Sequence, residues 1–445
     1  VEKNVDQTKG SFDAGDVFTP TDGEGNVLQG YYLFVTDPTS IAGDDTKDTS
    51  TATSPIFAIV GATGVTVDEK TSIPTVSKAV MDDKDHSWVT GAKGDPNKAA
   101  DSAMDDWVDY KLVGTVASNI DTYSDYKYCF TDVLPKSMTP NFEDVTVKIG
   151  DKTVKNDSEH GYTKNFSDDN VLTVNFKNLK DCVDVKNNHI TVNADSKVTV
   201  EYKAKLDSTK IFDNDGKIKG IFDGLVGKAQ TNTVKLTYSN NPHSEGTEGT
   251  EGTGTTVEHP AYDYTYGIDV TKVGSDDDTK GLKDVQFTLQ EKDSDKFIKA
   301  DGTTTTDKDA AILTTNNEGK INVVGLDEGT YTLTEVTPAP GYNNSASKGV
   351  TFTIARGTLQ QDGSEVKPDK GSANVTAADG VIKADSAAVS TGKLSFTIVD
   401  QKGTGLPLTG LNGVTFTWIA GGAVLCIGVA HLIRSRKQAE ESEQE

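Results

Sequence analysis

The chain has 445 residues, enough for roughly two to four domains that each bury a core. Its 44 Lys and Arg residues stand against 68 Asp and Glu residues, which gives a formal net charge of −24 at pH 7. This excess of negative charge argues against nucleic acid and anionic lipid surfaces as partners. Gly is frequent and aromatic residues make up only 7% of the chain, a composition typical of soluble β modules with many turns.

Cysteine spacing and enzyme motifs narrow the kinds of site to expect. The chain has 3 cysteines, and Cys426 lies in an apolar run, so only Cys129 and Cys182 could form a disulfide; either thiol could also be a small strand residue. There is no C-x-x-C spacing for a metal and no G-x-S-x-G or H-E-x-x-H motif. We therefore expect no metal, no cofactor and no enzymatic action on outside substrates.

Residues 1–73 form an N-terminal piece in which the sequence signals are weakest. The chain begins with VEKNVDQ, without Met and without an apolar leader. The C-terminal anchor described below implies earlier export, so we expect this end to be processed or truncated.

Alternating apolar residues predict strands throughout residues 74–403. The segments VLTVNF, ITVNA and KVTVEYKAKL alternate in this way, with Asn, Asp and Gly at the turns between them. Many short strands predict an all-β chain of tandem immunoglobulin-like sandwiches, with a middle domain over 74–262 and a C-terminal domain over 263–403. The Gly-rich run 244–256 is either a loop tip or part of a linker.

Three ionisable residues continue apolar rows on strands of the C-terminal domain. The rows are Tyr266, Ile268, Val270 and Lys272; Tyr331, Leu333 and Glu335; and Leu394, Phe396, Ile398 and Asp400. Burial lowers the pKa of a lysine and raises that of a carboxyl group, so Lys272 would become a nucleophile and Glu335 could donate a hydrogen bond to Asp400. Either a buried ion-pair network or an amide bond between Lys272 and Asp400 would account for the pattern.

The middle domain repeats this arrangement with different spacing. The rows are Val76, Lys78 and Val80; Met104, Asp106, Val108, Tyr110 and Leu112; and Asn232, Val234, Leu236 and Tyr238. Asn240 continues the last row and is the alternative to Asn232. Asp105, in contrast, falls on the positions of its strand that face outward. The alternation turns Lys78, Asp106 and Asn232 toward the interior of the domain.

The last segment, residues 404–445, has three parts in a fixed order. LPLTG at 406–410 precedes the apolar run 414–433, in which His431 is the one strongly polar residue, and the basic sequence RSRK follows. The run is long enough to span a bilayer as a transmembrane helix, and the basic flank places its end on the cytoplasmic side. This order resembles the cell-wall sorting signal of Gram-positive surface proteins, which implies sortase cleavage between Thr409 and Gly410.

The segment GTYTLTEVTPAPGY (329–342) resembles the E-box of collagen-adhesin B-type domains. Those domains form an isopeptide bond between a lysine on the first strand and an Asn or Asp on the last, assisted by the E-box Glu. The resemblance implies a Lys272–Asp400 bond assisted by Glu335. Because Asp400 stands where Asn is commoner, water rather than ammonia would leave.

The middle domain, including VASNIDTYSDYKYCFTDVLPKSMTPN (116–141), resembles the second domain of sortase-assembled shaft pilins. That resemblance implies a Lys78–Asn232 bond assisted by Asp106. It also suggests Lys70 as the amine that joins subunits, although the Tyr-Pro-Lys-Asn context of shaft pilins is missing. An exposed interdomain lysine is the other interpretation of Lys70.

Together these features resemble those of a major (shaft) pilin of a Gram-positive bacterium, which implies a covalent fibre subunit that crosslinks itself. The implied partners are pilus-specific and housekeeping sortases, other pilin subunits and peptidoglycan. The implied location is the cell wall and the pilus outside it, after transient membrane anchoring. The alternative is a wall-anchored adhesin or minor pilin that uses the same modules as a stalk.

Overall fold

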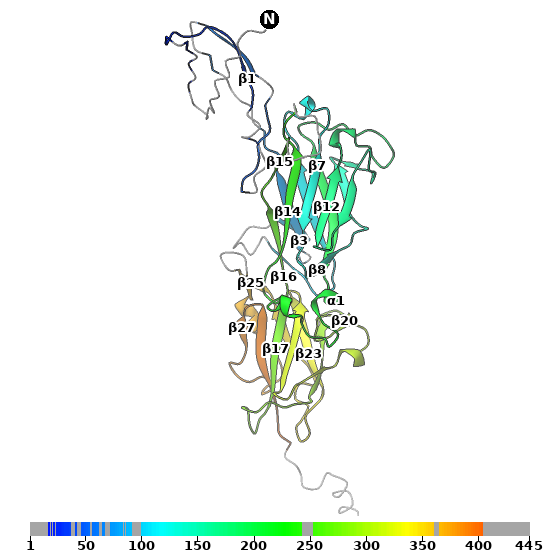
Figure 1. The fold of residues 1–445 in the computed structure, drawn as a ribbon. Coiled ribbons are helices and arrows are strands. Elements are labelled where there is room, and N and C mark those ends of the chain that lie inside the picture. The colour runs from blue at the N-terminus through cyan, green and yellow to red at the C-terminus, as the bar shows by residue number, and fades with distance from the viewer. Residues whose placement is uncertain are drawn as a thin grey trace, which may run out of the picture.

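The computed structural model describes residues 99–242, 252–359 and 365–403, and shorter stretches between residues 17 and 90. Those stretches are 21–22, 24–36, 46–53, 56–61, 65–66, 72–82 and 86–90, with the single residues 17, 19, 41 and 84. Two β-sandwiches follow one another along an elongated molecule, and a hairpin lies beyond them at the N-terminal end (Figure 1). The all-β fold class is therefore confirmed.

The N-terminal hairpin consists of β1 (Gly30–Phe34) and β2 (Ile56–Val60), which pair antiparallel. The rings of Tyr31 and Phe57 stack across the two strands with centroids 5.5 Å apart. Both side chains remain largely exposed, so the hairpin contributes little to a core.

The middle domain contains two sheets that face each other. The first, the β3 sheet, has the strand order β10 (Lys152–Thr153), β9 (Thr146–Ile149), β13 (Lys197–Leu206), β6 (Val108–Thr115), β3 (Val76–Asp82) and β4 (Ser87–Thr90), with β8 (Met138–Pro140) also paired to β13. The second, the β14 sheet, has the order β11 (Thr163–Phe166), β12 (Val171–Phe176), β7 (Tyr128–Val133), β14 (Gln230–Ser239), β16 (His259–Tyr264) and β5 (Ala100–Asp101), with β15 (Thr253–Thr255) paired to β14.

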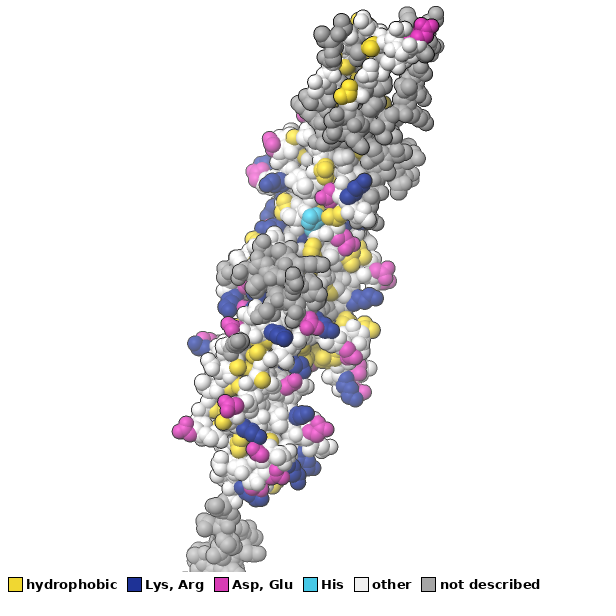
Figure 2. Space-filling model, turned by 90° about the vertical axis from the view of Figure 1, so that its left-hand side faces the viewer, with side chains coloured by type: hydrophobic (Ala, Val, Ile, Leu, Met, Phe, Trp, Pro, Cys, Tyr) yellow, Lys and Arg dark blue, Asp and Glu magenta, His cyan; other side chains and the backbone are white. Residues whose placement is uncertain are grey.

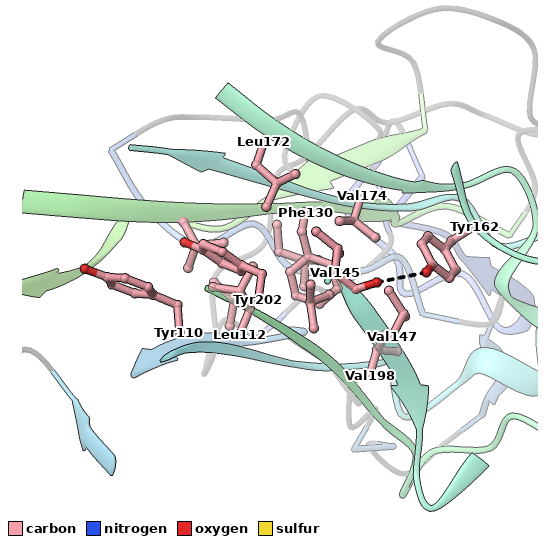
Figure 3. Close-up of a cluster of buried hydrophobic side chains, with 14 of the residues drawn as sticks. Tyr110, Leu112, Phe130, Val145, Val147, Tyr162, Leu172, Val174, Val198 and Tyr202 are labelled. Atoms are coloured by element: carbon pink, nitrogen blue, oxygen red, sulfur yellow. Dashed lines mark hydrogen bonds between the residues drawn. The ribbon is translucent and has the colours of Figure 1, made fainter. Parts of the chain in front are cut away.

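Alternation of apolar residues accounts for the core between these sheets. In β13 every second residue from Val198 to Leu206 is buried, as the sequence predicts for a strand with one face inward. Figure 3 shows Tyr110, Leu112, Val198 and Tyr202 of the β3 sheet meeting Phe130, Leu172 and Val174 of the β14 sheet. Gly114 in β6 is part of this fit, because a Cβ there would lie 2.3 Å from the Tyr128 hydroxyl.

The C-terminal domain is a second sandwich. Its β17 sheet has the order β22 (Lys320–Leu326), β17 (Tyr266–Gly274), β28 (Lys393–Asp400) and β27 (Ala388–Ser390). The facing β23 sheet has the order β20 (Thr304–Thr305), β19 (Phe297–Ile298), β18 (Gln286–Glu291), β23 (Gly329–Thr337) and β24 (Val350–Ile354), with β21 (Leu313–Thr314) paired to β18. A hairpin of β25 (Arg356–Leu359) and β26 (Val366–Pro368) stands beside them.

Helical structure is sparse in the described ranges. It comprises α1 (Ser208–Ile211) and the 3-10 turns η2 (Ile120–Thr122), η3 (Leu179–Asp181), η4 (Gly220–Phe222), η5 (Asp309–Ala311) and η6 (Lys370–Ala373). None of the helices among the described residues has the length and apolar character needed to cross a membrane. The predicted transmembrane helix, 414–433, lies outside the described residues.

The two sandwiches meet where β16 runs into β17 at Thr265, close to the boundary expected after residue 262. Across this joint the Arg356 guanidinium lies 2.6 Å from Asp82 and 2.8 Å from Asp101, both in the middle domain. The Tyr266 hydroxyl of the C-terminal domain also donates to Asp101, at 2.8 Å. These buried polar contacts link the two sandwiches across the joint.

On the face shown in Figure 2, charged side chains of both signs are interspersed over both sandwiches. The acidic excess of the chain is thus spread out rather than gathered into one patch on the face shown.

Candidate functional sites: two buried lysine clusters

The C-terminal sandwich contains a buried cluster of Lys272, Glu335 and Asp400, which we call the C-terminal cluster. Lys272 lies on β17 and Asp400 on β28, and these strands are parallel neighbours in which Lys272 pairs with Ile398 and Asp400 with Gly274. Glu335 lies on β23 in the facing sheet. The structure thus brings together the three residues that the sequence analysis grouped, and all three are buried.

Lys272 contacts both carboxyl groups of this cluster. Its Nζ lies 2.5 Å from Oδ1 of Asp400 and 3.2 Å from Oε2 of Glu335. Backbone N–H groups add to the site: Ser345 donates to Oδ1 of Asp400 and Ala346 to Oε2 of Glu335, each at 3.2 Å. One lysine therefore faces two carboxyl groups. If all three groups were ionised, the buried cluster would carry a net negative charge.

Glu335 is the carboxyl group of the cluster that burial inclines to hold a proton. Burial raises the pKa of Glu335 to about 7, the charge of Lys272 opposes the rise, and the hydrogen bond with Asp400 adds to it. Oε1 of Glu335 and Oδ2 of Asp400 are buried and accept no donated hydrogen bond when both groups are written as carboxylates. With its raised pKa Glu335 can hold a proton, and a protonated carboxyl can donate a hydrogen bond inside the cluster.

The middle sandwich contains a second cluster, the middle cluster, formed by Lys78, Asp132, Tyr202 and Asn232. Lys78 on β3 and Tyr202 on β13 belong to one sheet, whereas Asp132 on β7 and Asn232 on β14 belong to the other. All four side chains are buried. The cluster therefore spans the space between the two sheets.

Hydrogen bonds join the members of the middle cluster. Lys78 forms an ion pair with Asp132 and donates to the Tyr202 hydroxyl at 3.0 Å. That hydroxyl donates to Oδ2 of Asp132 and accepts a hydrogen bond from Nδ2 of Asn232 at 2.8 Å. Lys78 and Asn232 thus share one hydroxyl group as their common neighbour.

Burial favours the neutral forms of Lys78 and Asp132. Desolvation lowers the pKa of Lys78 to about 8, although the charge of Asp132 opposes the shift. Desolvation also raises the pKa of Asp132, and here Lys78 opposes it. The rings of Tyr110 and Tyr202 lie 5.3 and 5.4 Å from Nζ of Lys78 and exclude water around it. A proton passed from Lys78 to Asp132 would leave a neutral amine, which is a nucleophile.

The sequence-based assignment of Asp106 to this cluster is wrong. β6 begins only at Val108, and the residues before it form a turn in which Asp105 has a φ of 64°. The alternation of inward-facing residues therefore starts only with β6 and does not include Asp106. Asp106 is exposed and lines a groove beside Gly325 and Glu328. The carboxylate beside Lys78 is Asp132.

Sequence reasoning missed both Asp132 and the role of Tyr202. Asp132 continues the row of inward-facing residues formed by Tyr128 and Phe130 on β7. The alternation that singled out Lys78 and Asp400 was therefore present for Asp132 too. Tyr202 has inward parity too, but nothing in its spacing distinguishes a hydroxyl in a polar cluster from an ordinary core tyrosine.

Asn240, the alternative to Asn232, is buried elsewhere. Its amide Nδ2 donates to the backbone oxygen of Ile41 at 2.6 Å, and its own backbone oxygen accepts from Ala52 at 2.6 Å. It ties the segment before the middle domain to β14. Asn232 is the amide that lies in the cluster with Lys78.

The other predicted positions contribute nothing to the two clusters. Lys70, Thr409 and Gly410 lie outside the described residues. Lys136 is exposed in the turn between β7 and β8. Cys129 and Cys182 are both free thiols, so the possible disulfide between them is absent from the structure.

One family model matches most of the C-terminal domain. The family model described as the SpaA prealbumin-like fold domain matches residues 267–367. No curated protein matches the chain.

Solved pilin structures resemble the chain. The T6 backbone pilin of serotype M6 Streptococcus pyogenes matches with a TM-score of 0.52 and 16% identity, over 85% of this chain and 81% of that one. The group B streptococcus pilus 2b backbone protein has 20% identity and a TM-score of 0.44, over 69% of this chain and 97% of that one. The Corynebacterium diphtheriae major pilin SpaA has 14% identity and a TM-score of 0.47, over 86% and 84%. Residues 267–367 thus match a SpaA-type prealbumin-like domain, in a chain that shares the fold of a streptococcal backbone pilin.

Proposed function

We propose that the protein is the structural subunit of a covalent Gram-positive pilus, polymerised by sortase and crosslinked internally by one isopeptide bond in each sandwich. One observation carries the proposal. In each sandwich a fully buried lysine on the first strand of the domain shares a polar cluster with the Asn or Asp of a late strand. The shared fold with a backbone pilin supports the same function.

In the C-terminal sandwich, Nζ of Lys272 bonds to Cγ of Asp400 and water leaves. Glu335 takes a proton from the ammonium and returns one to the departing oxygen, because it contacts Lys272 and its pKa is raised to about 7 beside Asp400. The product is a neutral amide, which removes two charges from the core. It also joins β17 to β28, so a pull on the ends of this domain cannot separate these strands.

In the middle sandwich, Nζ of Lys78 bonds to Cγ of Asn232 and ammonia leaves. Asp132 accepts the proton that frees the amine, a role that its ion pair with Lys78 supports. This bond links the β3 sheet to the β14 sheet and closes a loop of more than about a hundred residues. By the model used for disulfides, such a crosslink constrains the unfolded chain by on the order of 5 kcal/mol.

Assembly uses residues outside the described part of the chain. Sortase cleaves between Thr409 and Gly410 and holds Thr409 as an acyl group, which the Lys70 amine of the next subunit attacks. A housekeeping sortase finally transfers the polymer to peptidoglycan, so the subunit lies in the cell wall and in the fibre outside it. The lysines of the two clusters are unsuited to joining subunits, because both are buried.

The test is a blot of cell-wall extracts from the native host, probed with an antibody against this chain. The unaltered chain should give a high-mass ladder, and Thr409→Ala should give only monomer because it removes the threonine of the LPLTG cleavage motif. A single wall-bound band from the unaltered chain would contradict a shaft subunit and favour a wall-anchored adhesin or minor pilin.

A further inference from the structure

The Tyr202 hydroxyl is the central atom of the middle cluster. It accepts from Nζ of Lys78 at 3.0 Å and from Nδ2 of Asn232 at 2.8 Å, and it donates to Oδ2 of Asp132. The amine that attacks, the nitrogen that leaves and the carboxylate that handles protons therefore all meet at one O–H group. The neighbouring Tyr110 has the same ring orientation, but its hydroxyl points to the sulfur of Met138 at 3.6 Å.

We propose that Tyr202 is a catalytic proton relay that carries a proton from Asp132 to the departing nitrogen of Asn232. The inference rests on the Lys78–Asn232 bond proposed above. An amide nitrogen leaves only after it gains a proton, because the amide anion is too basic to depart. Tyr202 is in hydrogen-bond contact with that nitrogen, whereas Asp132 bonds to Lys78 and Tyr202.

Asp132 takes one proton from the Lys78 ammonium, and the neutral amine forms a bond to Cγ of Asn232. Tyr202 then gives its proton to Nδ2 while Asp132 returns a proton to Tyr202. The C–N bond to Nδ2 breaks, ammonia leaves, and the new amide nitrogen gives its extra proton to Asp132. Tyr202 ends as the hydroxyl it was at the start, and Asp132 ends protonated.

The direction of the relay follows from the state of Asp132. While Asp132 is a carboxylate, the Tyr202 hydroxyl donates to it, as in the structure. Once Asp132 carries the lysine proton it becomes a donor, so Tyr202 can turn its own hydrogen toward Nδ2. Burial raises the pKa of Tyr202 and keeps the proton on its hydroxyl until that moment.

The C-terminal cluster provides a natural contrast. There Glu335 contacts Lys272 directly and shares a hydrogen bond with the Asp400 carboxyl group. One acid can therefore reach both the attacking and the departing group, and no hydroxyl is needed between them. In the middle cluster Asp132 and Asn232 are bridged by Tyr202.

The test follows bond formation over time in newly synthesised protein. Each full chain is made by cell-free translation, and intact mass is recorded at intervals for the loss of ammonia and of water. Tyr202→Phe keeps the ring that packs against Tyr110 and Lys78 but removes the relay proton. Tyr110→Phe is the matched control, since it removes a hydroxyl from the adjacent ring.

We expect Tyr202→Phe to lose ammonia on the order of a hundredfold more slowly, while its loss of water in the C-terminal domain is unchanged. Tyr110→Phe should lose both at the normal rate. Normal loss of ammonia in Tyr202→Phe would overturn the relay and leave the bond standing. An unaltered chain that never loses ammonia would instead overturn the Lys78–Asn232 bond itself.

A second replacement covers the case in which Tyr202→Phe does not fold. Site-specific 3,5-difluorotyrosine at position 202 keeps the ring and the hydroxyl but makes the hydroxyl more acidic. A relay predicts a several-fold faster loss of ammonia, because proton donation to Nδ2 becomes easier. An unchanged rate would show that the hydroxyl is only a structural hydrogen-bonding group and would contradict the relay.

Discussion

Nζ of Lys272 lies 2.5 Å from Oδ1 of Asp400, and neither side chain is exposed to solvent. Taking both charges out of water costs several kcal/mol per ion, which their attraction repays only when the geometry is favourable. An amide between the two groups removes that cost permanently. The contact between Lys272 and Asp400 also links the first strand of the C-terminal domain to its last. A covalent bond at this place resists a pull on the two ends of the domain most directly.

Glu335→Ala should leave the C-terminal domain without its crosslink. The variant removes the group that takes the lysine proton, so the protein should retain one water while still losing ammonia in the middle domain. Intact-protein mass spectrometry measures both losses in one experiment. Glu318→Ala, at an exposed glutamate of the same domain, should behave as the unaltered chain. Loss of water in Glu335→Ala would mean that Glu335 has only a structural role.

Asp132→Ala should retain ammonia, because no other member of the middle cluster can take the proton from Lys78. The matched control is Asp106→Ala, which removes a carboxylate of the same domain that lies on an exposed turn. That control should form both bonds. Ammonia retained in Asp106→Ala and lost in Asp132→Ala would reverse the assignment.

Asn232→Ala should make the stability of the middle sandwich depend on pH above 8. The variant leaves Lys78 as a free buried amine with a pKa of about 8, against 10.5 for a solvated lysine. Between these values the unfolded chain binds one proton more than the folded chain, so the free energy of unfolding rises with pH, by on the order of 3 kcal/mol over the window. In the crosslinked chain the amide nitrogen does not titrate and this rise is missing.

Denaturant unfolding followed by tryptophan fluorescence provides this measurement, since Trp88 and Trp107 both lie in the middle sandwich. Thr231→Ala, an exposed neighbour on β14, is the control and should follow the unaltered chain. Parallel pH curves for Asn232→Ala and the unaltered chain would contradict a crosslink at Lys78.

Lys70→Ala should separate polymerisation from anchoring. The subunit still has its cleavage site and should reach the wall, but the ladder should vanish because the joining amine is gone. Blots of the wall fraction from the native host measure this directly. A normal ladder would show that another lysine joins the subunits, and Lys136, exposed in the turn after β7, is the next to replace.

Period-two alternation was enough to predict the fold class and the C-terminal cluster. Leu394, Phe396, Ile398 and Asp400 are all buried along β28, and the strand is regular over its whole length. Parity is reliable there because no bulge or turn interrupts the row.

The same reasoning failed where the backbone changes conformation. Parity placed Asp106 inward by extending the row of β6 backward, but the turn at Asp105 ends the alternation before β6 begins. Asp132 reaches Lys78 because the two sheets of the sandwich pack face to face, and spacing along one strand carries no information about that packing.

The most direct test of the account is the intact mass of the purified, unaltered chain. Two internal isopeptide bonds predict a mass below that of the sequence by one ammonia and one water. Peptide mapping should then recover Lys78 joined to Asn232 and Lys272 joined to Asp400. A mass equal to that of the sequence would contradict the account, because both lysines would then be simple buried ion pairs.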